Sequence, residues 1–201
     1  IDDVIVASLY ATPAAGRGAA GISYVIFGSS SPVDVQLNTI ATGSTNGFRI
    51  LGVSQNDACG AALSAAGDVN DDGVDDVIVG CFLANPLVRS YAGMSYVVFG
   101  RSMANGVAAS YANVNLLPIN SGGKATGFAI LGASDGDNSG TSVSGVGDIN
   151  GDNIPDLIVG ANAANPVVGT TRSSAGVSFV VLGRKPAAGS TILTNIDLLG
   201  F

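Results

Sequence analysis

The chain has 201 residues, a net charge of −7, two cysteines, no histidine and no tryptophan. The negative charge disfavours nucleic acid and anionic lipid as partners. The lack of histidine excludes imidazole catalysis and histidine-containing metal sites. Apolar residues make up 47% of the chain, but no apolar run approaches the roughly 18 residues of a membrane span. We therefore expect neither a nucleic-acid partner nor membrane insertion.

Three short apolar runs rich in Val, Ile, Phe and Tyr lie in the first part of the chain, at residues 1–7, 21–28 and 47–52. Each is bounded by Gly, Asn, Asp or Ser, which is typical of strands separated by turns. The same runs return later in the chain as the second, third and fourth strands of a longer unit. Residues 1–52 are therefore predicted to form strands two to four of a partial unit.

Residues 53–132 hold the most complete unit, with strands predicted near 60–67, 77–82, 93–99 and 127–132. Four antiparallel strands in about 70–80 residues make one blade of a β-propeller with long connections. The strand at 77–82 is almost continuously apolar, as expected when neighbouring sheets cover both of its faces. A two-sheet sandwich of short strands is the alternative architecture.

The two cysteines of the chain, Cys59 and Cys81, both lie in this unit. They form a disulfide if the protein matures in an oxidising compartment. Otherwise they are two buried thiols that act as small apolar residues. The sequence alone leaves both interpretations open.

An acidic loop joins the first two predicted strands of the complete unit. Its oxygen-bearing side chains occupy positions 1, 3, 5 and 9 of a turn, and Gly73 at position 6 tolerates the left-handed backbone that such a turn needs. Oxygens at alternate positions of a curled loop converge on one point, and Ca²⁺ takes six to eight oxygen ligands. The predicted ligands are the side chains of Asp68, Asn70, Asp72 and Asp76 and the main-chain carbonyl of Val74.

The loop recurs at an offset of 80 in residues 133–201, a region predicted to hold strands one to three of a further partial unit. A C-terminal segment, 192–201, resembles the lead-in at 114–118 and precedes the place where a fourth strand would follow. The second predicted set of calcium ligands is Asp148, Asn150, Asp152, Asp156 and the carbonyl of Ile154. The sequence thus predicts two calcium sites.

The acidic loops have three other possible interpretations. An EF-hand needs a glutamate at position 12, where this chain has Val79 and Val159 inside apolar strands. Magnesium prefers near-octahedral sites that retain water, so it ranks below calcium. Solvated turns rich in Asp, Asn and Gly are common in any protein, but two such loops at equivalent positions of a repeat favour ion binding.

Segment 60–80, together with 93–100 and 47–52, resembles the FG-GAP repeats of integrin α-subunit heads and of large bacterial surface proteins, with the bacterial extracellular type the closer match. The resemblance implies an all-β fold of propeller-like blades with four antiparallel strands each. About two and a half to three blades are represented, open or completed by other copies. It also implies that calcium lies in the first hairpin of each blade.

The function expected from this resemblance is a calcium-stabilised structural or adhesive module of an extracellular or cell-surface protein, and not an enzyme. Its expected partners are other copies or adjoining repeats through open blade edges, as in a fibre or tandem array, and a protein or glycan ligand. The alternative is a carbohydrate- or protein-binding propeller module of a larger secreted enzyme. The carboxylates available for acid–base catalysis are Asp34, Asp135, Asp137 and Asp197.

Overall fold

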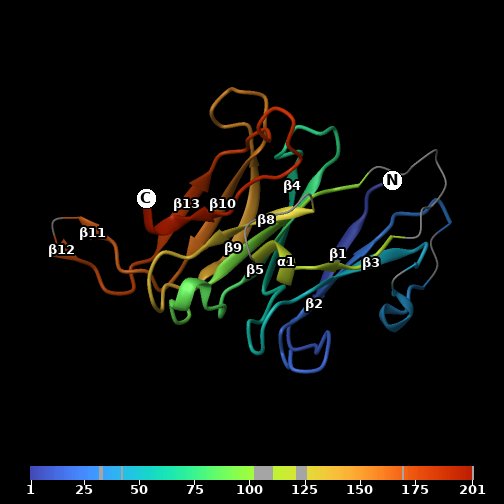
Figure 1. Ribbon diagram of the computed structural model, residues 1–201, viewed down its shortest axis with the longest axis horizontal. Coiled ribbons are helices and arrows are strands. Elements are labelled where there is room, and N and C mark those ends of the chain that lie inside the picture. The colour runs from blue at the N-terminus through green and yellow to red at the C-terminus, as the bar shows by residue number, and fades with distance from the viewer. Residues whose placement is uncertain (32–33, 42, 102–110, 121–125, 169, 201) are drawn as a thin grey trace.

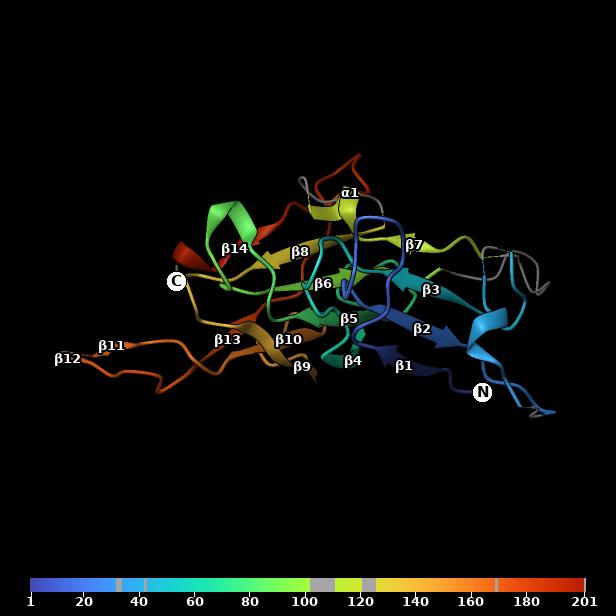
Figure 2. The same cartoon turned by 90° about the horizontal axis from the view of Figure 1, so that it is seen from below.

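The protein is all-β, and its strands form three sheets that lie side by side along the long axis of the molecule (Figures 1 and 2). The computed structural model describes residues 1–31, 34–41, 43–101, 111–168 apart from 121–125, and 170–200. Phe201, the last residue of the predicted lead-in segment, lies outside the described residues.

The first sheet, at the N-terminal end of the molecule, has the order β1-β2-β3-β7. Its strands are β1 (Val4–Ser8), β2 (Ile22–Ile26), β3 (Gly47–Leu51) and β7 (Val114–Asn115). The first three are antiparallel, and β7 pairs in parallel with β3. A lead-in strand from the second half of the chain therefore extends a sheet built from the first 51 residues.

The central sheet has the order β14-β8-β6-β5-β4. Its strands are β4 (Ala62–Gly67), β5 (Asp76–Cys81), β6 (Met94–Val98), β8 (Gly127–Leu131) and β14 (Ile196–Asp197). The first four are antiparallel and lie within two residues of their predicted positions. The C-terminal lead-in supplies β14, which pairs in parallel with β8 just as β7 pairs with β3.

The third sheet contains β9 (Ser139–Gly147), β10 (Asp156–Ala161) and β13 (Val177–Val181), all antiparallel. A small hairpin of β11 (Val167–Val168) and β12 (Thr170–Thr171) projects from its far end (Figure 2). The described helices are single turns: α1 (Leu117–Asn120) and the 3-10 turns Leu37–Thr39, Pro86–Val88 and Leu198–Gly200. None of the described helices is long and apolar enough to cross a bilayer.

Two apolar cores lie on the two faces of the central sheet, because side chains alternate along each strand. On β6, Tyr96 and Val98 belong to the core shared with the first sheet, and Val97 belongs to the core shared with the third. All three are 1% exposed or less. Coverage of both faces explains the almost continuous apolar runs and confirms the predicted arrangement of propeller-like sheets.

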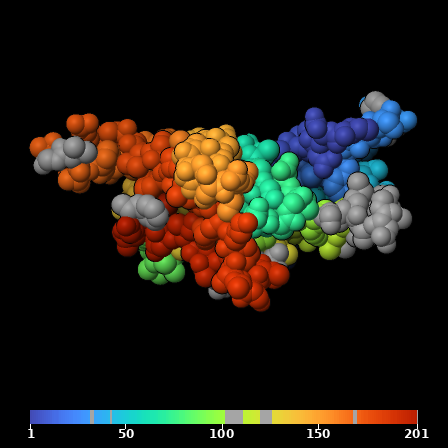
Figure 3. All heavy atoms as spheres, turned by 90° about the horizontal axis from the view of Figure 1, so that it is seen from above, coloured from blue at the N-terminus to red at the C-terminus, as the bar shows by residue number. Residues whose placement is uncertain are grey.

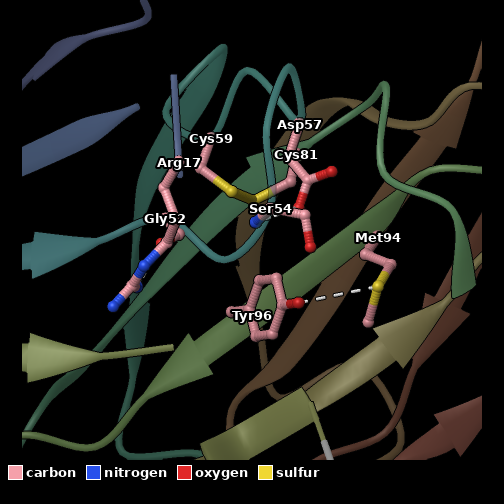
Figure 4. Close-up of a disulfide and its surroundings, with 8 residues drawn as sticks. All are labelled: Arg17, Gly52, Ser54, Asp57, Cys59, Cys81, Met94 and Tyr96. Atoms are coloured by element: carbon pink, nitrogen blue, oxygen red, sulfur yellow. Dashed lines mark hydrogen bonds between the residues drawn. A yellow bond between two sulfur atoms is a disulfide. The ribbon is translucent and has the colours of Figure 1, made fainter. Parts of the chain in front are cut away.

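Cys59 and Cys81 form a disulfide, which settles the alternative left open by the sequence. The bond links the segment before β4 to the end of β5, beside the buried ring of Tyr96 (Figure 4). At an offset of 80 the same positions hold Ser139 and Ala161, which face each other across β9 and β10. The disulfide therefore reinforces in one repeat a strand pairing that the next repeat makes without it.

Candidate metal-binding loops

The first acidic loop is the turn between β4 and β5, and it curls around one carboxylate. Asp68 accepts hydrogen bonds from the backbone N–H groups of Asp72 (2.9 Å) and Gly73 (2.7 Å). The side-chain oxygen of Asn70 also accepts from the backbone of Asp72, at 2.9 Å, and Asp72 accepts from the backbone of Val74 at 3.0 Å. These bonds fix side chains at positions 1, 3 and 5 to the backbone of a single turn.

The second acidic loop, between β9 and β10, repeats each of these bonds and adds one from the backbone of Gly151 to the side chain of Asp148, at 2.7 Å. Asp148 accepts from the backbone of Asp152 (3.1 Å) and of Asn153 (2.8 Å), and Asp152 accepts from the backbone of Ile154 (2.9 Å). Position 6 is left-handed in both loops, with φ of 89° at Gly73 and 68° at Asn153, as the spacing predicts.

The aspartates at position 9, Asp76 and Asp156, have a structural role that the sequence analysis missed. Both are buried, and each carboxylate accepts two backbone N–H groups, one from its own acidic loop and one from the segment after the third strand. Asp76 accepts from Val69 (3.1 Å) and from Gly100 (2.8 Å). Asp156 does the same with the backbone of residues 149 and 183, at 2.9 and 2.8 Å. Each carboxylate thus fastens its acidic loop to the end of the third strand.

The first sheet contains a third example of this contact between an aspartate and a glycine, and the three examples share a sequence pattern. The backbone of Gly28 donates to Asp3 at 2.9 Å in the first sheet. In all three repeats an aspartate stands at the start of the second strand or directly before it, and a glycine follows the third. The presence of both residues, and not the acidic loop alone, is the sequence pattern that indicates the structural role of the aspartate.

The electrostatics of the loops favour a bound cation. Burial raises the pKa of Asp76 to about 7; its two backbone hydrogen bonds lower it, and the negative charges of Asp72 and Asp68 raise it further. In the second loop the backbone hydrogen bonds, that from Asn153 first, lower the pKa of Asp148. A cation beside either loop would relieve the repulsion among its carboxylates.

The two loops differ in their surroundings. The segment after β13 covers the first loop: the backbone of Arg184 donates to the carbonyl of Val69 at 2.9 Å, and Lys185 forms an ion pair with Asp71. As a result Asn70 is buried, whereas its counterpart Asn150 is exposed. The second loop therefore presents its ligand candidates more openly to solvent.

The donor chemistry of both loops fits calcium. Each offers hard oxygen donors only: three carboxylates, one amide oxygen and one main-chain carbonyl. A carboxylate has about four acceptor positions, so Asp76 keeps capacity after accepting two N–H groups. The described residues nevertheless contain no group of three or more acidic, cysteine or histidine side chains gathered to hold a metal. The structure thus places all ten predicted ligand residues on two equivalent turns and does not display a closed cage.

Three of the four carboxylates considered for acid–base catalysis make structural contacts. Asp135 accepts from the backbone of Ser90 at 3.0 Å, and Asp137 is buried and accepts from the backbone of Ser134 at 2.9 Å. Asp197 forms an ion pair with Arg89, and Asp34 is exposed.

Comparison with known proteins identifies one segment of the chain. Residues 139–181, which hold β9, the second acidic loop, β10 and β13, match the family model described as FG-GAP repeat. No curated protein matches the chain. The FG-GAP family is a structural repeat family and is generally non-enzymatic. The resemblance seen in the sequence is therefore confirmed over residues 139–181, which match the FG-GAP repeat model.

Proposed function

We propose that the chain is a calcium-stabilised structural module of an extracellular or cell-surface protein, in which each acidic loop binds one Ca²⁺ ion. The observation that carries the proposal is the set of hydrogen bonds that the two loops, 80 residues apart, share. Ordinary turns share composition, but not a conserved set of oxygens aimed by the same backbone bonds.

The role proposed for calcium is structural. The bound ion would neutralise three carboxylates of a loop that connects the first two strands of a sheet, and so stabilise that sheet. The protein's own hydrogen bonds hold each loop in place. Asp68 and Asp148 organise the two turns, and Asp76 and Asp156 anchor them to the ends of the third strands. Through adjoining repeats, several such sheets would act as a rigid structural or adhesive element.

The proposed location outside the cytosol has independent support from the disulfide between Cys59 and Cys81. Disulfides persist in secreted and cell-surface proteins and are rare in reducing compartments. FG-GAP repeats also occur typically in extracellular proteins.

Thermal unfolding with and without calcium tests the proposal. At free calcium about 100-fold above Kd, each site adds ~2.7 kcal/mol to the free energy of unfolding. Two sites then raise Tm by about 10–20 °C in a chain of this size. Magnesium at the same concentration should give a much smaller shift. A Tm that is the same in calcium and in chelator would contradict the proposal.

Matched variants separate site binding from a general charge effect. Asp72→Asn and Asp152→Asn each remove one candidate ligand charge but keep an oxygen that can accept from the backbone of position 7. Each should lose about half of the calcium-dependent shift. Asp34→Asn removes the same charge at an exposed position outside both loops, and should keep the full shift.

A further inference from the structure

One arginine-containing loop occurs in each of the three sheets, with the pattern Arg-x-x-Ala-Gly before the third strand of the repeat. The pattern begins at Arg17, Arg89 and Arg172. Arg17 donates to the carbonyl of Gly52 at 2.8 Å, and Arg89 donates to the carbonyl of Ala133 at 3.0 Å. Each of these arginines thereby holds the segment that leaves the fourth strand of its own sheet and runs to the next.

The backbone of the same loop receives that segment through four further hydrogen bonds. In the first sheet the carbonyls of residues 18–21 accept from the N–H groups of 56, 58, 59 and 52, respectively, at 2.9–3.2 Å. In the central sheet the carbonyls of residues 90–93 accept from 136, 138, 139 and 132, at 2.8–3.0 Å. The donors are offset by 80 in every case, so one docking geometry is used twice.

The segment that follows the fourth strand approaches the backbone of the receiving strands and loop so closely that only glycine fits there. A Cβ on Gly80 would lie 2.1 Å from the carbonyl oxygen of Gly140, and a Cβ on Gly93 would lie 2.1 Å from that of Ser139. Such distances leave no room for any other residue. At the equivalent glycines of the third sheet, Gly160 and Gly176, the nearest atoms all belong to the third sheet itself.

The third sheet has the same arginine-containing loop and strand edge, but within the described residues no segment is bound to them. Within the described residues, β13 pairs only with β10, the carbonyls of residues 173–176 accept no hydrogen bond, and the exposed side chain of Arg172 makes none. Val180 is 43% exposed, whereas its counterpart Val97 is buried. An open hollow of about 350 Å³ lies between residues 160–162 and 175–178, where the central sheet holds residues 139–140.

We infer that this surface, the docking face formed by β13, Arg172–Ser178 and residues 160–162, binds a strand-and-loop segment of another FG-GAP repeat. The segment has the pattern of residues 127–140: a strand that pairs with β13, followed by a loop that lies across residues 173–176. Arg172 donates to a main-chain carbonyl of the segment, at the glycine that ends the strand or at the residue after it, as Arg17 and Arg89 do. The third sheet lies at one end of the molecule (Figure 3), so an incoming segment reaches the docking face from solvent.

The chemistry of the docking face selects its occupant. Main-chain hydrogen bonds provide the affinity, as in other cases of strand addition to a sheet edge. Specificity comes from glycine, because a side chain at the position of Gly132 would lie 2.0 Å from the main-chain oxygen of the receiving loop. The acidic loops take no part, so the inference goes beyond the calcium proposal and does not depend on it.

A peptide with the sequence of residues 127–140, titrated into the 201-residue protein in calcium-containing buffer, tests the inference. We expect saturable binding at one site, together with slower amide hydrogen exchange in β13. Arg172→Ala removes a side-chain donor to a main-chain oxygen and should weaken binding by roughly 10-fold. Ser173→Ala is the matched control, because it keeps the backbone carbonyl, and should bind like the unmodified protein.

A second peptide, with valine in place of the residue equivalent to Gly132, should not bind. The inference is wrong if the first peptide fails to bind, if the valine peptide binds equally well, or if Arg172→Ala has no effect. Sedimentation tests the other occupant: a concentration-dependent dimer that the peptide dissociates would assign the docking face to a second copy. Failure on any of these counts leaves the calcium result unaffected, since that is read from Tm.

Discussion

Arg89 and Asp197 form a two-pronged ion pair across 108 residues of chain, with Nη1–Oδ1 and Nη2–Oδ2 distances of 2.8 and 3.0 Å. Arg89 lies in the loop before β6, and Asp197 lies in β14. The pair thus fastens the lead-in strand to the edge of the central sheet. In the first sheet, Arg17 makes the equivalent contact with Asn115 of β7, at 3.0 Å.

We predict that a double-mutant cycle of Arg89→Ala and Asp197→Asn gives a coupling of about 0.5–1 kcal/mol, since Asp197 is partly solvated. The hydrogen bond from Arg89 lowers the pKa of Asp197, so the coupling is present above the unfolded pKa of about 4. It should be lost as the pH falls through the lowered folded value. Arg17→Ala, whose partner is an uncharged asparagine, should show no such pH dependence in urea unfolding.

The disulfide should contribute measurably to stability. Closing a loop of this length lowers the entropy of the unfolded chain by an amount worth about 3 kcal/mol, or about 6–12 °C in Tm. The variant Cys59→Ser with Cys81→Ala, which copies the Ser139–Ala161 pair of the next repeat, should melt lower by that amount. A reductant should lower the Tm of the parent protein and leave that of the variant unchanged. Equal effects on both would contradict the assignment.

Asp57 gives the stability a pH dependence of opposite sign to that of Asp197. Burial raises its pKa to about 6, although the hydrogen bond from the backbone of Ser54 lowers it. Because the folded state binds the proton more tightly, its contribution is full below about pH 4 and is lost as the pH rises to about 6. The loss amounts to at most about 2–3 kcal/mol.

Asp57→Asn should therefore flatten the stability profile between pH 4 and 6 and raise Tm at neutral pH. The amide oxygen of the variant can still accept a hydrogen bond from the backbone N–H of Ser54, which donates to Asp57 at 2.9 Å. The measurement is the difference in Tm between variant and parent at each pH. A constant difference across this range would show that burial of the charge has no energetic effect.

The two kinds of loop aspartate should respond differently to calcium removal. Asp76 accepts two backbone N–H groups, and an asparagine can accept only one of them while its amide group faces the other. Asp76→Asn should cost about 1–3 kcal/mol even in chelator. Asp72→Asn should lower Tm only when calcium is present. If both variants behave alike in chelator, the structural role assigned to Asp76 is wrong.

Most of the fold could be predicted because the same strand-forming runs recur along the sequence. Residues 93–100 repeat 21–28, and the strands drawn from such runs lie within two residues of their predicted positions. The positions of β7 and β14 were not predicted, since strands of two residues have no periodicity. Their place at a sheet edge depends on contacts such as Arg89 with Asp197, which join residues far apart in sequence.

The acidic loops show a second limit of prediction from the sequence. Spacing alone predicted which side chains share a turn, and the backbone bonds of Asp68 and Asp148 agree with it. Spacing did not predict that Asp76 and Asp156 are buried anchors, because their partners lie in the segment after the third strand, 24 and 27 residues away. Nor did it predict the disulfide, since the proximity of Cys59 and Cys81 depends on the register between β4 and β5.

Calorimetric titration of the calcium-free protein with CaCl₂ tests the central claim most directly, since it counts the ions bound. The account predicts two ions per chain for the parent protein and one each for Asp72→Asn and Asp152→Asn, with the remaining site unaffected in either variant. No heat of binding, or an unchanged stoichiometry in both variants, would show that the acidic loops are not calcium sites.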